Sequence, residues 1–198
     1  MTTPRLSGAT SNQMPTPESH EALMQLAARR ELELIAARRM SEVFSQHIKL
    51  QDLLEQGLHI ALDVVNAENG SVLLADTDHR TLVFYHSIGQ QPVPPGTAVP
   101  WYEGIAGTVY RTGVPEIVPD AQTDVRHFKQ VDEATGAITH DMVTLPLKRW
   151  EGDPIGVIQV MNKRGGEFLN RDDMAILTII ASLAAVAIEH TRLVEAAK

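Results

Sequence analysis

Apolar residues recur along the chain with two different periods, and each period predicts a different kind of element. Residues 18–66 carry apolar side chains at three- and four-residue steps, an imperfect heptad seam interrupted by Arg30 and Ser41. A single helix of about 48 residues would be about 70 Å long. No domain of this size covers such a length, so we expect its free part to pair with another chain. Two shorter helices with a break are the alternative.

Shorter apolar runs, separated by turn residues, predict about six mainly antiparallel strands. The expected strands are residues 70–76, 81–87, 97–101, 116–118, 141–149 and 154–162. Turn residues join the first two and the last two of these strands into hairpins. Residues 104–112 predict a short helix that ends at Gly113, and residues 171–196 predict a closing helix.

Helices on an antiparallel sheet form a domain of the α+β class. We expect the long N- and C-terminal helices to cover one face of the sheet. The short helix and the irregular segment 100–140 would cover the other face as a lid over a ligand pocket. The predicted organisation is a disordered tail at 1–17, a signalling or dimerisation helix at 18–49, and a folded domain at 50–198.

A polar motif marks the joint between the last strand and the closing helix. The motif consists of Asn162, Lys163, Phe168, Asp172 and Asp173. The two aspartates fall in the first helical turn, where carboxylates are favourable, and Asn170 is the expected N-cap. The spacing predicts an ion pair between Lys163 and Asp172, with Phe168 filling the gap beneath it. The motif could serve only as a well-made strand–turn–helix joint.

Composition excludes several classes of function. The 198 residues are 43% hydrophobic with a formal net charge of −8, enough for one domain of about 150 residues plus an extension. The acidic balance argues against a nucleic-acid partner. The chain has no cysteine, which excludes disulfides and thiolate sites. The longest apolar run, residues 174–188, is shorter than the about 20 residues of a membrane span. We expect a buried helix there, no membrane span, and a cytoplasmic location.

The joint motif is similar to the N-K-x(n)-F-x(3)-D-E signature of GAF domains in cyclic nucleotide phosphodiesterases and related cyclases, with Asp173 in place of the final Glu. The resemblance covers residues 50–195 and includes GIAGTVYRTG, VDEATG and the run VTLPLKRWEGDPIGVIQVMNK. The segment VDEATG resembles the V-D-x-x-T-G segment that closes over the nucleotide in this family. The chain therefore resembles a GAF domain of the phosphodiesterase and adenylate cyclase type, which implies the GAF fold.

The resemblance implies a ligand site of eight positions. Those that match the family's contact positions are Ser71, Ile105, Ala106, Phe128, Asp132, Thr135, Thr139 and Gln159. The free N–H groups that begin the short helix can hold an anion without a lysine. Gln159 interrupts an apolar strand and needs a partner, either a ligand or a lid residue. Ser87 and Ile88 stand where guanine-selective relatives carry an aromatic residue and an acid, which favours adenine or a less selective pocket.

The expected function is that of a sensory module without enzymatic activity, required cofactor or metal site. No H-E-x-x-H, Walker loop or hydrolase elbow is present, and the cysteines used by GAF-type methionine sulfoxide reductases and bilin-attaching GAF domains are missing. We expect a small-molecule ligand, cAMP or cGMP, and a homodimer formed through the N- and C-terminal helices. The output domain would lie on another chain or in a longer parent protein.

Two other functions stay open at this point. The chain could be a ligand-free dimerisation scaffold, since a fold does not settle a function. It could also be a haem or gas sensor in which His86, His127 or His140 ligates the iron.

Overall fold

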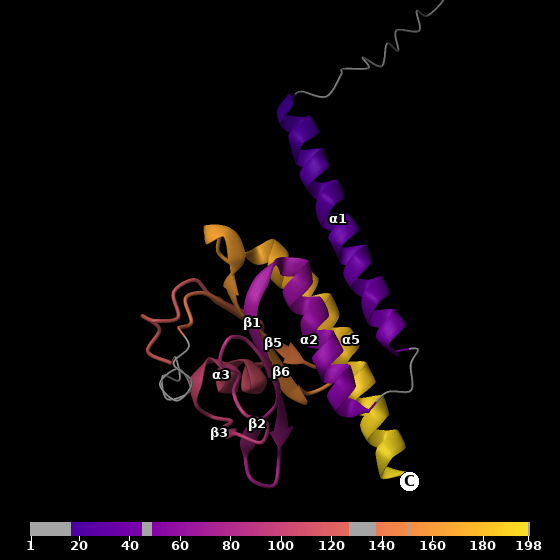
Figure 1. Ribbon diagram of the computed structural model, residues 1–198, viewed down its shortest axis with the longest axis vertical. Coiled ribbons are helices and arrows are strands. Elements are labelled where there is room, and N and C mark those ends of the chain that lie inside the picture. The colour runs from indigo at the N-terminus through magenta and orange to yellow at the C-terminus, as the bar shows by residue number, and fades with distance from the viewer. Residues whose placement is uncertain (1–16, 45–48, 127–137, 150, 198) are drawn as a thin grey trace, which may run out of the picture.

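The computed structural model describes residues 17–44, 49–126, 138–149 and 151–197 (Figure 1). The helices are α1 (Pro17–Phe44), α2 (Leu50–Val65), α3 (Gly104–Thr112) and α5 (Arg171–Ala196), with a 3-10 turn, η1 (Arg164–Gly166). The strands are β1 (Ala67–Asp76), β2 (Thr81–Ile88), β3 (Ala98–Pro100), β4 (Glu116–Val118), β5 (Met142–Leu147) and β6 (Gly156–Lys163). The predicted strands and the bounds of the short and closing helices are confirmed, and the fold is of the α+β class.

The strands form one six-stranded antiparallel sheet in the order β3-β2-β1-β6-β5-β4. Each predicted hairpin supplies two neighbouring strands, and the pairing of β1 with β6 joins the two hairpins at the centre of the sheet. In this register Ser71 of β1 lies opposite Ser87 of β2 on one side and opposite Gln159 of β6 on the other. The register therefore gathers polar residues from distant parts of the sequence.

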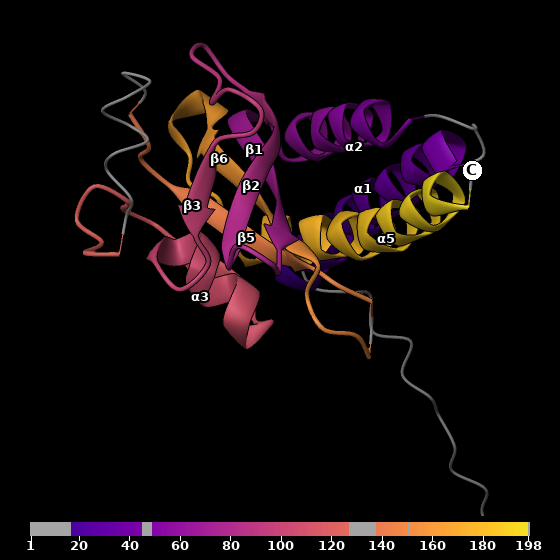
Figure 2. The same ribbon diagram turned by 90° about the horizontal axis from the view of Figure 1, so that it is seen from below.

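Helices α2 and α5 cover one face of the sheet, and α3 lies on the other face (Figure 2). Leu58 of α2 and Ile180 of α5 are fully buried together with Val72 and Ile158, which alternate along β1 and β6 with residues of the opposite face. Burying such a side chain contributes about 1.5–3 kcal/mol. This apolar layer packs α2 and α5 against the sheet. The opposite face of the sheet, where α3 lies, therefore takes no part in this packing.

Residues 18–66 do not form the single long helix that the heptad seam predicted. Helices α1 and α2 run in opposite directions (Figure 1), so the alternative of two shorter helices is correct. Met40 of α1 is fully buried against the other helices. An ion pair of 3.0 Å joins Arg39 to Asp63 of α2. The cause is tertiary packing. Burying apolar side chains from the C-terminal half of α1 against α2 and α5 is more favourable in free energy than continuing one straight helix.

The closing helix α5 is the one helix, among the described residues, that is long and apolar enough to cross a membrane by length and composition. Leu177, Ile180 and Ile188 are nevertheless buried against the sheet and the other helices. The apolar run of α5 therefore forms part of the domain core, as expected, but its burial and not the length of the helix shows this.

The predicted ion pair at the strand–helix joint has a different acidic partner. Lys163 Nζ lies 2.7 and 2.9 Å from the carboxylate oxygens of Asp173, not of Asp172. Asp173 also accepts the N–H of Asn170, whose side-chain oxygen accepts the N–H groups of both aspartates, so the predicted N-cap is confirmed. Asp172 points outward and binds Arg29 of α1 at 2.7 Å. The third helical position faces back toward the cap, which is why Asp173 reaches the lysine.

The gap beneath the joint is filled by Leu169 and not by Phe168. Phe168 is 61% exposed, whereas Leu169 is 2% exposed. The N–H of Leu169 donates to Asp141 at 2.8 Å, and the other oxygen of this buried carboxylate accepts the N–H of Lys163 at 3.3 Å. Asp141 thus ties the end of β6 to the start of α5.

Replacing Asp173 by Ala is expected to lower the free energy of unfolding by about 3 kcal/mol, because it leaves the largely buried ammonium of Lys163 with only the exposed Glu167 at 3.8 Å as an acidic partner. The side chains of Lys163 and Asp173 are only 11% and 10% exposed. Chemical denaturation measures the change. The matched control is Asp172→Ala, which removes a 65% exposed carboxylate and should cost less than about 1 kcal/mol. Equal losses in the two variants would contradict this assignment.

Candidate functional site

A cavity of about 360 Å³ lies between the sheet and the start of α3. Its volume is in the range of small-molecule sites. Strands β1, β2 and β6 form its floor, and residues 103–106 and 138–140 contribute to its walls. The face of the sheet opposite the helical layer therefore carries the hollow that the sequence predicted.

Five of the eight predicted contact positions line this cavity. They are Ser71, Ile105, Ala106, Thr139 and Gln159. The other three, Phe128, Asp132 and Thr135, lie outside the described residues. Asn162, expected only as part of the joint, also lines the cavity.

Two serine hydroxyls lie together on the floor. Ser71 Oγ and Ser87 Oγ are 3.2 Å apart, and the backbone N–H of Val93 donates to Ser87 Oγ at 3.2 Å. Ser71 is 2% exposed. From the sequence alone, Ser87 is only the residue that, together with Ile88, replaces the aromatic–acid pair of guanine-selective relatives. Its pairing with Ser71 follows from the register of β1 and β2.

The amide nitrogen of Gln159 has partners within the sheet, which the sequence-based prediction of a ligand or lid partner did not include. Its Nε2 donates to Thr144 Oγ1 at 3.2 Å and lies 3.2 Å from the sulfur of Met142. Both partners belong to β5, and Thr144 lies directly opposite Gln159. The NH₂ group of Gln159 is satisfied because the neighbouring strand supplies an acceptor. The apolar pattern of β6 by itself does not reveal that acceptor.

The N-terminus of α3 provides backbone N–H groups at the cavity wall. The first helical bond is from Gly107 N–H to Glu103 O, and Glu103 forms no side-chain cap, so the preceding N–H groups are free of intrahelical partners. Gly104 has a φ of +72°, which favours glycine. A Cβ at Gly107 would lie 2.6 Å from Trp101 O. The two glycines therefore serve the turn and the close packing of α3.

The described part of the cavity lining contains no lysine or arginine. It includes the carboxylates of Glu68 and Glu103 and the imidazole of His140. An anion would therefore depend on the N–H groups and dipole of α3 for attraction.

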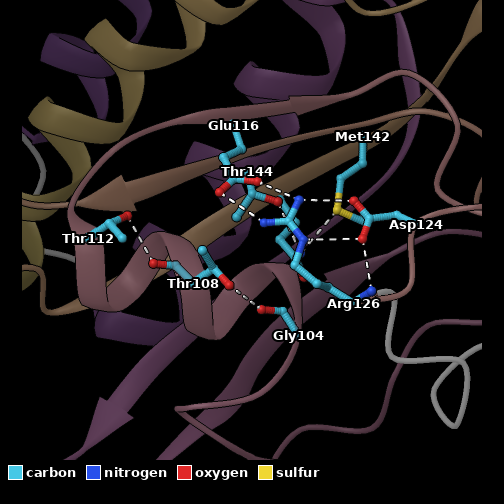
Figure 3. Close-up of polar contacts among 9 residues, drawn as sticks. Gly104, Thr108, Thr112, Glu116, Asp124, Arg126, Met142 and Thr144 are labelled. Atoms are coloured by element: carbon cyan, nitrogen blue, oxygen red, sulfur yellow. Dashed lines mark hydrogen bonds and ion pairs between the residues drawn. The ribbon is translucent and has the colours of Figure 1, made fainter.

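Arg126, which is not part of the described lining, is already paired with two carboxylates. Arg126 binds Glu116 of β4 and Asp124, each at 2.9 Å (Figure 3). The hydrogen bonds to Asp124 and Glu116 raise the pKa of Arg126 above its usual range. Because these two carboxylates balance the charge of Arg126, its guanidinium is not available to bind an anionic ligand.

Asn162 holds two backbone groups at the edge of the cavity. Its side-chain oxygen accepts the N–H of His140 and its amide donates to Ile138 O, both at 2.8 Å. Its φ is +60°, in the left-handed region that Asn tolerates better than most residues. This one residue therefore turns the chain at the end of β6 and positions the wall at 138–140.

Of the three histidines considered as haem ligands, His140 lines the cavity, His86 does not, and His127 lies outside the described residues. Within residues 17–44, 49–126, 138–149 and 151–197, no group of three His, Asp or Glu side chains could hold a metal ion.

Comparison with known sequences identifies the family. The family model described as GAF domain matches residues 47–189. The dual 3′,5′-cyclic-AMP and -GMP phosphodiesterase 11 of Drosophila melanogaster is 35% identical over 97 residues, 49% of this chain and 7% of that protein. The phosphodiesterase 11A of Takifugu rubripes, of the same dual type, is 34% identical over 101 residues, 50% of this chain and 11% of that protein. The matched region is thus a small part of either relative.

Solved structures share the fold. The GAF domain of an Acinetobacter phosphoenolpyruvate-protein phosphotransferase has a TM-score of 0.68 at 20% identity, covering 81% of this chain and 95% of that one. A free methionine-R-sulfoxide reductase from Neisseria meningitidis, solved with its substrate, has a TM-score of 0.68 at 19% identity, covering 86% and 93%. At this identity the likeness establishes the fold alone.

Replacing Asn162 by Ala is expected to lower the free energy of unfolding by about 2–3 kcal/mol, because two hydrogen bonds are lost and Ala tolerates the left-handed backbone less well than Asn. Asn162→Gly is the matched variant, since glycine accepts the positive φ and loses only the hydrogen bonds. Urea denaturation of both should show a smaller loss for the glycine variant. Identical losses would show that the backbone conformation contributes nothing.

Proposed function

The chain belongs to the GAF domain family, and we propose that it is a sensory module whose cavity binds a cyclic nucleotide. The observation that carries this proposal is the cavity of about 360 Å³ with hydroxyl and amide groups on its floor and helix N–H groups at its wall. A nucleotide needs such a combination, because its base forms directional hydrogen bonds and its phosphate needs a positive electrostatic environment.

The charge of the lining fits a monoanion better than a more highly charged ligand. A cyclic phosphodiester carries one negative charge, which the free N–H groups at residues 104–106 and the dipole of α3 can stabilise. The carboxylates of Glu68 and Glu103 oppose any negative charge in the cavity, so each charge beyond the first adds to an electrostatic cost that the α3 N–H groups must offset. The names of the two phosphodiesterase relatives give further support for a cyclic nucleotide.

We further propose that the ligand signal passes through a homodimer of the outer helices. The N-terminal half of α1 extends beyond the domain (Figure 1) and exposes Leu23 (57%). Leu34, in the C-terminal half of the same helix, is 72% exposed, and both leucines lie on the predicted seam. Near the other end of the helical layer, Leu193 of α5 is 71% exposed. A ligand shifts such helices only through different affinities for two arrangements. The output domain would lie on another chain or in a longer parent protein.

Catalysis is not part of this proposal. A GAF domain is a regulatory module, and the chain has no cysteine with which to carry out thiol chemistry. We propose a cytoplasmic module that needs no cofactor other than its ligand. The alternative, a ligand-free dimerisation scaffold, differs in a single measurable property, which is the absence of nucleotide binding.

Isothermal titration calorimetry of the purified chain with cAMP and cGMP is expected to give a saturable signal with at least one of them. Ala106→Glu should weaken binding at least tenfold, because it places a carboxylate beside the phosphate position. Ala106→Gln, of nearly the same size but uncharged, should weaken it less. Absence of heat with both nucleotides would favour the scaffold.

Dimerisation is expected to double the mass of 21.7 kDa measured by light scattering coupled to size exclusion. Leu34→Glu should shift the equilibrium toward monomer, because it places a charge on the exposed apolar seam of α1. Glu31→Lys, a change on the same helix but off the seam, is the control. A monomeric wild-type chain at high micromolar concentration would remove the dimer from the proposal.

A further inference from the structure

The floor of the cavity presents an ordered row of polar side chains on three neighbouring strands. Ser87 lies on β2, Ser71 on β1 and Gln159 on β6, and all three line the cavity. Ser71 is directly opposite each of the others in the register. Opposite residues of antiparallel strands have Cβ atoms about 4.5–5.5 Å apart, so one planar ring can contact the serine pair and the amide together.

The two serines supply one donor hydrogen to the cavity. Their Oγ atoms are 3.2 Å apart, and Ser87 Oγ already accepts the N–H of Val93. Two hydroxyls carry two hydrogens, and the bond between them uses one. Whichever serine donates in that bond, the second hydrogen is left over, and no other described residue accepts it.

Gln159 supplies one acceptor. Its amide contacts the sulfur of Met142 and the hydroxyl of Thr144, each at 3.2 Å. A thioether can accept a hydrogen bond but cannot donate one, so the NH₂ side of the amide must face Met142. The carbonyl oxygen is then on the other side of the amide, and no described residue donates to it.

We propose that this donor and acceptor recognise the adenine ring of a cyclic nucleotide. Gln159 Oε1 accepts a hydrogen from the 6-amino group, and the serine pair donates to the adjacent ring nitrogen. Met142 and Thr144 are positioning residues that orient the amide, and Ser87 positions Ser71. The inference rests on the proposed function and names the base that the same cavity selects.

Counting donors and acceptors excludes an equally good fit for guanine. On the edge that carries N7, guanine has two acceptors, O6 and N7, whereas adenine has one donor and one acceptor. Guanine would therefore direct an acceptor at Gln159 Oε1. On the edge that carries N1, guanine also presents a donor, N1–H, beside an acceptor, O6, but it adds a 2-amino donor for which the row has no second acceptor. A desolvated group without a partner weakens binding, so the site prefers cAMP to cGMP.

The test compares three ligands by calorimetry: cAMP, cGMP and the 3′,5′-cyclic monophosphate of purine riboside, which lacks the 6-amino group. The intact chain is expected to bind cAMP about tenfold more tightly than either other ligand, the effect of one lost hydrogen bond. Gln159→Met keeps the side-chain size, removes the acceptor, and should bring cAMP and the purine analogue to equal affinity.

Thr144→Val tests the positioning role without touching the ligand. It removes the acceptor that orients Gln159, so the ratio between cAMP and the purine analogue should shrink several-fold. Thr178→Val, the same substitution at an exposed site of α5, should leave the ratio unchanged. Because Thr144→Val is nearly isosteric, it keeps the test decisive if Gln159→Met fails to fold.

The outcomes separate this inference from the proposed function. If no cyclic nucleotide binds, the proposed function fails and the inference with it. If cyclic nucleotides bind but cGMP binds as tightly as cAMP, or the ratio to the purine analogue survives in both Gln159→Met and Thr144→Val, the adenine assignment is overturned while the nucleotide site stands.

Discussion

The pairing of β1 with β6 is the constraint on which the rest of the molecule depends. These two strands come from opposite ends of the domain sequence, and their hydrogen-bonded ladder joins the two hairpins into one sheet. Side chains of a strand alternate between faces, so the same ladder directs Val72 and Ile158 to the helices and Ser71 and Gln159 to the cavity. A shift of one residue would exchange the two faces and destroy both the core and the site.

The two faces of the sheet have different physical tasks. The helical face is a continuous apolar layer that supplies most of the favourable burial. The other face contains polar side chains that would be costly to bury alone, but Gln159 is satisfied by β5 and Ser71 by Ser87. Within the described residues, no buried side-chain nitrogen or oxygen lacks a hydrogen-bond partner. The cavity can therefore persist without a ligand and still offer one donor and one acceptor.

The joint after β6 connects the site to the helical layer. Asn162 positions residues 138–140 at the cavity wall, and the next residue, Lys163, binds Asp173 at the start of α5. Asp172 in turn binds Arg29 of α1. Two consecutive strand residues thus contact the cavity wall and the helix that supports α1, which gives the proposed ligand signal a short route of hydrogen bonds and ion pairs to the outer helices.

Local patterns along the chain were sufficient to predict the helices and strands. They depend only on neighbours a few residues away, as for the alternation of apolar residues, the turn residues, Gly113 and the Asn170 cap. The motif at the joint, together with GIAGTVYRTG, VDEATG and the run that ends in Asn162 and Lys163, was sufficient for the family. Five of eight predicted contact positions line the cavity because a family motif reflects a shared fold. The partners of these residues were not predictable in the same way. These partners depend on which segments meet in space, and only the packed sheet and helices decide that. Examples are the pairing of Lys163 with Asp173, the burial of Leu169 and not Phe168, the folding back of α1, and the orientation of Gln159 by Thr144.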